Sequence, residues 1–230
     1  MKDFGIKTED LKDVGAFFGH RISRCHPKMK TFVLGIKGSD HINVIDLEKT
    51  KEFLIKTLEY IEELTKQGKT ILFVGTKVAS KNLIEEFAKN VAHPYVSERW
   101  IGGTLTNFET IKKRVDYLKD LEKKRESGDL QKYTKKEQLE FDKIIERLKL
   151  KFEGIKSLEK RPDVLFVVDI KKDALAVKEA RMKEIPVIAI TDTNVDPTLV
   201  DYPIPANDDA KSSVKYILDK IQQVIIDNKK

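Results

Sequence analysis

Short apolar runs alternate along the chain with segments in which apolar residues recur every three or four positions. The short runs predict strands, and the three- and four-residue spacing predicts helices with one buried face. Residues 70–74 and 164–168 are apolar at nearly every position, as in a strand buried on both faces of a sheet. The predicted strands are residues 31–36, 42–46, 70–74, 95–96, 164–168, 186–190 and 202–204, and the predicted helices are residues 47–67, 80–91, 173–183 and 208–226.

This alternation of strands and helices predicts an α/β fold in which a parallel sheet carries helices on both faces. The helix over residues 47–67 also has terminal signals, because Asp46 is a suitable N-cap and Gly68 a suitable stop. In such a sheet the natural site lies in the loops that follow the strands. These loops are residues 75–77, 169–171 and 192–194.

Residues 108–158 break the alternation. Two apolar series in this segment have the spacing of heptads, and they consist of Phe108, Ile111, Val115 and Leu118, and of Phe141, Ile145, Leu148, Phe152 and Ile155. A turn at residues 127–129 separates them, and Thr134 with Glu137 forms a capping box at the start of the second. We therefore predict an antiparallel coiled-coil hairpin at residues 108–158, inserted into an α/β domain made of residues 1–107 and 159–230.

The net charge of +6 is concentrated in one segment of the chain, so it bears on the kind of partner. Residues 111–161 hold 17 Lys and Arg against 11 Asp and Glu, so 17 − 11 = +6 and the remainder of the chain is neutral in sum. A second basic stretch, residues 14–39, contains no acidic residue. Two positive segments on a balanced body favour specific docking to a polyanion.

The remaining composition narrows the protein class. Cys25 is the only cysteine, so an internal disulfide is excluded and a reducing compartment is expected. No apolar run approaches the roughly 20 residues that a membrane helix needs. The opening residues are mixed in charge and have neither the apolar core of a secretory signal nor the composition of a transit peptide. A cytoplasmic protein without a membrane partner is expected.

Several partial motifs predict no cofactor or metal. Residues 71–77 resemble the end of a phosphate-binding loop, but Thr70 replaces a glycine and Val78 the hydroxyl residue. Asp192 and its neighbours imitate a calcium loop, but Pro197 stands where glycine is needed. The spacings of His20, Cys25, His26 and His41 match no zinc pattern. No Ser/His/Asp set and no pair of carboxylates stands out at a strand end, so no catalytic residue is expected.

The segment Arg99–Asn107 (RWIGGTLTN) holds the only tryptophan, beside an arginine and a glycine pair. One interpretation is a hinge in which Trp100 packs the junction with the hairpin. The other places Arg99 on a phosphate and brings the backbone close to RNA. The sequence leaves both open.

Together the motifs of the chain resemble the ribosomal protein S-two family of the small subunit, of bacterial and organellar type. In order, they are FGHR (18–21), PKMK (27–30), IDLEKT (45–50), LFVGTK (72–77), RWIGGTLTN (99–107), GIK (154–156), PD (162–163), IPV (185–187), DTN (192–194) and IPANDDA (204–210). The resemblance covers nearly the whole chain. The sequence departs from the common family pattern at Cys25, at Ala206 and in its opening segment.

The resemblance implies a flavodoxin-like three-layer domain with a protruding coiled coil. It implies a structural, non-enzymatic role in translation, with binding to small-subunit ribosomal RNA near the junction of head and body. It also implies contact with neighbouring ribosomal proteins and a role in docking ribosomal protein S-one. The location would be the cytoplasm, or an organellar matrix or stroma if the source is not bacterial.

The expected RNA-binding residues follow from charge and position, because Lys and Arg neutralise phosphates. They are Arg21, Arg24, Lys28, Lys30, Lys77, Arg99, Trp100, Lys112, Lys113 and Arg114. Two alternatives stay open on the sequence alone. One is an enzyme of flavodoxin-like fold that binds a nucleotide or sugar phosphate at the strand ends, and the other is a coiled-coil adaptor without RNA contact.

Overall fold

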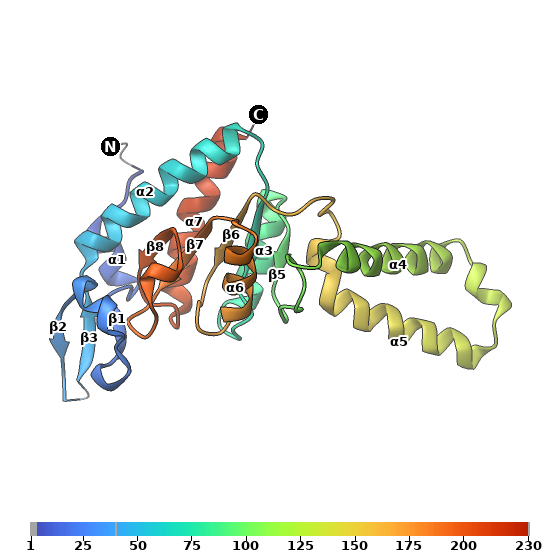
Figure 1. The fold of residues 1–230 in the computed structure, drawn as a ribbon, viewed down its shortest axis with the longest axis horizontal. Helices are drawn as coiled ribbons and strands as arrows, with labels where there is room; N and C mark the ends of the chain where they lie inside the picture. Colours follow the sequence, from blue (N-terminus) through green and yellow to red (C-terminus); the bar gives the residue numbers. More distant parts are fainter. Residues whose placement is uncertain (1–3, 40, 230) are drawn as a thin grey trace.

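The computed structural model describes residues 4–39 and 41–229 (Figure 1). Residues 1–3, part of the opening segment considered above, and residues 40 and 230 lie outside the described part. A five-stranded parallel sheet forms the centre, in the order β5-β4-β6-β7-β8. Its strands are β4 (Ile71–Val74), β5 (Tyr95–Val96), β6 (Val164–Val167), β7 (Val187–Thr191) and β8 (Tyr202–Pro205). Pro203 and Pro205 are compatible with β8 because it is an edge strand.

Four helices cover one face of this sheet: α1 (Thr8–Asp13), α2 (Leu47–Lys66), α3 (Lys81–Val91) and α7 (Lys211–Asn228). The sheet contributes Phe73 and Phe166 to this core, and both rings are fully buried. The expected N-cap of α2 is confirmed, since the Asp46 side chain accepts a hydrogen bond from the Glu48 amide. Among the described residues, no helix combines the length and the apolar character that crossing a membrane requires.

The opposite face of the sheet has a different cover. It packs against α6 (Ala174–Met182), the loop over residues 100–107 and the base of the segment that follows this loop. Trp100, Leu105 and Phe108 are buried there with Val177 of α6. The protein is thus a mixed α/β structure with a parallel sheet between two helical layers, consistent with the expected flavodoxin-like core.

Three strands between Phe18 and Ile45 form a separate sheet. The apolar pattern predicted two of these strands, at residues 31–36 and 42–46, but not that they pair outside the parallel sheet. The separate sheet is antiparallel and has the order β1-β3-β2, with β1 (Phe18–Arg21), β2 (Val33–Lys37) and β3 (Ile42–Ile45). The connection between β2 and β3 is too short for a parallel crossover, so these strands can only pair as a hairpin. Neither β1 nor α1 was expected, because both are short and β1 contains Gly19, His20 and Arg21. Residues 31 and 32, predicted as strand, belong to the 3-10 helix η2 (Pro27–Phe32).

Between β5 and β6 the chain forms α4 (Phe108–Glu126) and α5 (Lys135–Phe152), joined through the short helix η3 (Asp129–Lys132). The two helices lie side by side and extend away from the body (Figure 1). The capping box at Thr134 is confirmed, because its hydroxyl accepts from the Glu137 amide while the Glu137 carboxylate accepts from the Thr134 amide. Apolar side chains of both helices are buried at their interface, among them Val115, Leu118 and Ile145.

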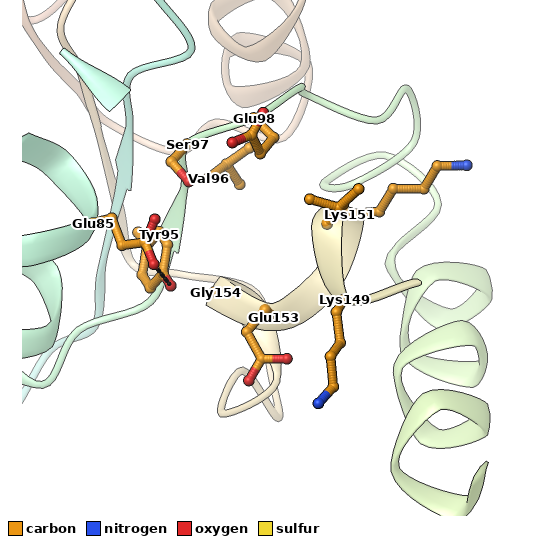
Figure 2. A pocket seen from close by; sticks show the side chains of 10 residues that line it. Glu85, Tyr95, Val96, Ser97, Glu98, Lys149, Lys151, Glu153 and Gly154 are labelled. Atoms are coloured by element: carbon orange, nitrogen blue, oxygen red, sulfur yellow. Dashed lines mark hydrogen bonds between the residues drawn. The ribbon is translucent and has the colours of Figure 1, made fainter. Parts of the chain in front are cut away.

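The base of α5 sits directly on the sheet edge. Gly154, in the 3-10 helix η4 (Glu153–Ile155), faces Tyr95 of β5 (Figure 2). A methyl group on Gly154 would lie 2.2 Å from the Tyr95 carbonyl oxygen, a backbone atom that cannot rotate away. Glycine is therefore required at position 154 for this close approach.

Replacing Gly154 with alanine is expected to lower the free energy of unfolding by about 2–3 kcal/mol, because η4 or β5 must shift to admit the methyl group. The measurement is urea denaturation followed by circular dichroism. Gly35→Ala is the matched control, since a methyl group there meets no atom within 4 Å. Equal stabilities of the two variants would contradict the prediction.

Candidate nucleic-acid interface

The basic segment, defined as residues 21–30, follows β1 and is attached to the body at two points. The His26 amide donates to the Thr193 carbonyl oxygen at 2.8 Å, and the Met29 side chain is fully buried. Pro27 begins η2, and the His26 side chain caps this helix by accepting a hydrogen bond from the Lys28 amide. The backbone is thereby held in place while the cationic side chains point outward.

The four predicted cations of the basic segment, Arg21, Arg24, Lys28 and Lys30, are all exposed. The ammonium of Lys28 lies 2.7 Å from Asp196 Oδ2 and 2.8 Å from Thr198 Oγ1. Hydrogen bonds from Lys28 and Thr198 hold the pKa of the Asp196 carboxyl far below its usual range. Within residues 4–39 and 41–229, Arg24 and Lys30 make no ion pair with a carboxylate. The segment therefore offers two cations that are available to an external anion.

Lys77 has a different environment from the one expected of a phosphate ligand. Its side chain is 23% exposed and its ammonium is surrounded by three carboxylates. The ammonium lies 3.1 Å from Asp169, 2.8 Å from Asp208 and 2.5 Å from Asp209. A phosphate would have to compete with all three, so Lys77 is better described as the counterion of an acidic cluster.

This acidic cluster corrects one prediction, because carboxylates do converge at the strand ends. Asp169 follows β6, Asp192 follows β7, and Asp208 follows β8. Burial raises the pKa of Asp208 to about 7, with a further contribution from the charges of Asp169 and Asp192. Burial alone would lower the pKa of Lys77, but its hydrogen bonds with Asp208 and Asp209 outweigh that effect and raise it. The lysine therefore stays charged, and Asp208 is the carboxyl that takes up a proton first.

His20 extends the cluster to β1. Its Nδ1 lies 3.2 Å from Asp192 Oδ1 and its Nε2 lies 3.6 Å from Asp209 Oδ2. The hydrogen bond with Asp192 raises the pKa of His20, and the nearby carboxylates add to this effect against the opposing effect of burial. Ligand atoms of these three residues lie within 4.8 Å of one another, and no other such group of His, Cys, Asp or Glu occurs in the described part of the chain. Nε2 also lies 3.0 Å from Asn194 Nδ2, closer than to Asp209, so the shorter of the two carboxylate contacts of His20 is the one with Asp192.

The loop over residues 100–107 is organised around one buried carboxylate. Glu179 of α6, only 3% exposed, accepts five hydrogen bonds from this loop. Oε1 accepts from Trp100 Nε1 and the Gly103 amide, and Oε2 accepts from the Leu105 amide and from the amide and hydroxyl of Thr106. Burial would raise the pKa of Glu179, but these donors lower it. The loop connects the sheet to α4, so Glu179 fixes the point from which α4 departs.

This arrangement separates the two interpretations of Arg99 and Trp100. The Trp100 ring is buried and its N–H is used by Glu179, so it packs the junction as the hinge interpretation requires. Arg99 is exposed beside it and remains available to a phosphate. On α4, Lys113 and Arg114 are exposed, whereas Lys112 is partly buried and donates to the Glu159 carbonyl oxygen at 3.1 Å.

The predicted RNA-binding residues thus occupy separate places. The basic segment lies at one end of the longest axis and the helices α4 and α5 lie at the other (Figure 1). Lys77 and Arg99 belong to the loops that follow β4 and β5 of the central sheet. The arrangement suits an extended partner that touches the body at several points.

Comparison with known proteins decides the family. The sequence profile described as "Ribosomal protein S2" matches residues 11–228. The chain belongs to the ribosomal protein S2 family. The resemblance seen in the sequence is confirmed, and the family is one of structural proteins, so this chain is not an enzyme.

Relatives of the S2 family match the chain almost end to end. A protein named small ribosomal subunit protein uS2, from Dictyoglomus thermophilum, is 46% identical over 97% of the chain and 90% of its own length. Proteins of the same name from Nitratiruptor sp. and Helicobacter acinonychis are 44% and 41% identical over 97% of the chain, and over 83% and 90% of their own lengths.

Two features of this S2-family protein escaped sequence reasoning. The role of Glu179 was hidden because it is one of many acidic residues with helical spacing. The acidic cluster was hidden because its members follow different strands. The Asn207-Asp208-Asp209 motif directly after a predicted strand was the available signal.

Proposed function

We propose that this S2-family protein is a structural component of the small ribosomal subunit that binds ribosomal RNA through the basic segment. The observation that carries this proposal is the exposure of Arg24 and Lys30 on a backbone anchored by buried Met29. A backbone that is already held loses little freedom when its cations meet a phosphate, and each neutralised phosphate releases counterions. Arg21 and Lys28 would extend this contact, with Arg99, Lys113 and Arg114 as further points.

The binding position on the subunit, the protein partner and the cellular location are inferred from membership of the S2 family. We infer binding near the junction of head and body, a contribution to docking ribosomal protein S-one, and a cytoplasmic location. Residues 108–158 would act as an inserted unit in which α4 and α5 pack as a coiled coil. The heptad positions Ile111, Val115, Leu118 and Ile145 support this packing, because all four are buried in a segment that is otherwise largely exposed.

Reversing the charge of Arg24 and Lys30 to glutamate is expected to reduce co-sedimentation of a tagged copy with small subunits at moderate salt. It should also lower the slope of log K against log salt for isolated ribosomal RNA by at least about 1.4, since each lost phosphate contact removes about 0.7–0.9. Lys211→Glu with Lys215→Glu is the matched control, because both lysines are exposed on α7, which packs on the same face of the sheet as α2 and α3.

Unchanged incorporation of the Arg24 and Lys30 variant would exclude the basic segment as a docking site. Migration of the wild-type protein at the top of the gradient would contradict the proposed function as a whole. Association that survives nuclease treatment without loss would indicate a protein-binding adaptor instead.

A further inference from the structure

The outer face of α6 is strongly basic. Lys178 and Arg181 are exposed on this helix, and Lys171, Lys172 and Lys183 are exposed beside its ends. In residues 4–39 and 41–229, none of these five cations forms an ion pair. Glu184 is the only exposed carboxylate between residues 170 and 184.

This asymmetry arises because the other acidic residues of the segment are used internally. Asp173 is buried and accepts hydrogen bonds from the amide and hydroxyl of Thr76, at 3.2 and 2.7 Å. Glu179 is buried beneath the loop over residues 100–107. Residues 170–184 hold five basic and three acidic residues, yet they present only one carboxylate beside the five cations to solvent.

A groove lies along the same face. It has a volume of about 550 Å³ and is lined by Ile170, Ala174, Val177, Lys178, Arg181, Met182 and Leu199. Its floor is apolar, whereas its rim carries the two cations. Met182, at the edge of the groove, is 65% exposed, so its apolar side chain is accessible to a bound partner.

The basic face continues onto the loop that precedes α4. Leu175 is 48% exposed, and a methyl group placed on Gly102 would lie 3.7 Å from its Cδ2 atom. Exposed Arg99 belongs to the same loop. The surface formed by the outer face of α6, the groove and this loop is called the α6 surface below.

We propose that the α6 surface is a second RNA-binding site, separate from the basic segment, in which Lys178, Arg181 and Lys183 contact phosphates and the groove receives an unstacked base. This inference rests on the proposed function. Single-stranded RNA is commonly recognised through cations along the backbone and bases placed against apolar or aromatic side chains. A groove with an apolar floor and a cationic rim offers both.

The charge of the surface favours RNA over a protein partner. Protein interfaces are depleted in lysine, and their cations are usually matched by carboxylates. Here four of the five cations are lysines, and one carboxylate stands beside them. A polyanion with regularly spaced charges is the better complement.

The test measures binding of the full-length protein to isolated small-subunit ribosomal RNA across a salt series. Lys178→Gln combined with Arg181→Gln is expected to lower the slope of log K against log salt by about 1.4–1.8, at two phosphate contacts of 0.7–0.9 each. The control is Lys211→Gln with Lys215→Gln, which should leave the slope unchanged. Circular dichroism of the variants establishes that the fold is retained.

Two outcomes would overturn the proposal, and they can be told apart. Wild-type binding with an unchanged slope in the Lys178 and Arg181 variant overturns the α6 surface and leaves the proposed function standing. Absence of salt-dependent RNA binding by the wild-type protein overturns both.

A second experiment identifies the partner directly. A photo-crosslinking amino acid replaces Met182, and the protein is irradiated within assembled small subunits. A crosslink to ribosomal RNA is the expected result. A crosslink to a protein alone, or none at all, would overturn RNA as the occupant of the groove.

Discussion

Replacing Glu179 with alanine is expected to lower the free energy of unfolding by about 3–5 kcal/mol. The substitution leaves the buried N–H of Trp100 and the amides of Gly103 and Leu105 without their acceptor. A buried donor that loses its partner costs about 1–3 kcal/mol, although water that enters the site restores part of it. Chemical denaturation of the purified protein measures the loss.

Glu179→Gln should have an intermediate effect on the free energy of unfolding. The glutamine side chain keeps one oxygen that can accept hydrogen bonds, but its NH2 group faces N–H and O–H groups of the loop, which are donors as well. Glu146→Ala is the control, since Glu146 is exposed on α5. The loop should also become sensitive to limited proteolysis between residues 100 and 107 in the alanine variant. If Glu179→Ala and Glu146→Ala were equally stable, the carboxylate would not organise the loop.

The second large effect is expected for Lys77→Ala. Removing one partner of a buried ionic group costs about 3–5 kcal/mol, because the opposite charge is left uncompensated. Here three carboxylates lose their shared cation. Lys81→Ala is the control, because Lys81 forms a more exposed pair with Glu98 and should lose less than about 1 kcal/mol.

The loss in Lys77→Ala should depend on pH. Asp208 already has a raised pKa of about 7 in the folded protein. Folding raises the pKa of this carboxyl, so between its unfolded and folded pKa values the folded protein binds a proton that the unfolded chain has released. The contribution of Asp208 to stability therefore decreases as pH rises between these two pKa values. Without Lys77 the pKa rises further, and the deficit should be largest near pH 8 and shrink toward pH 5.

Adding Asp208→Asn to Lys77→Ala should restore part of the stability at pH 8, because the most buried charge is then absent. His93 titrates in the opposite sense, since burial lowers its pKa to about 4. His93 is present in every variant, so its contribution to the pH dependence of stability cancels when the variants are compared. A pH-independent loss in Lys77→Ala, or an Asp208→Asn addition without effect, would contradict the proposed role of Lys77.

The sequence alone predicted the parallel sheet, since residues 70–74 and 164–168 carry apolar side chains on both faces of their strands. It also predicted the capping box at Thr134. Both signals are local, because each is carried by residues adjacent in the sequence. The N-terminal antiparallel sheet was not predicted, because β1 contains Gly19, His20 and Arg21, and pairs with β3 through residues distant in sequence.

The site was less accessible to sequence reasoning than the fold. Exposure of Arg24 and Lys30 agrees with what their charge suggested, but Lys77 has the same charge and proved to be an internal counterion. Charge does not reveal which carboxylates will lie nearby, since Asp169 and Asp208 approach Lys77 only after three strands have paired. The α6 surface is also a tertiary property, because it depends on Asp173 and Glu179 turning inward.

The pairing of β4 with β6 has a consequence for synthesis of the chain. Ile71 of β4 is paired with Val164 of β6, and the largely polar residues 108–158 are translated between them. At about 5–20 residues per second, roughly 5–20 s pass between emergence of the two strands. During that interval the nascent chain holds an apolar strand with only the two-residue β5 as a neighbour. The N-terminal sheet can close early, whereas the central sheet must wait, and this interval is when the protein is most open to chaperones and to aggregation.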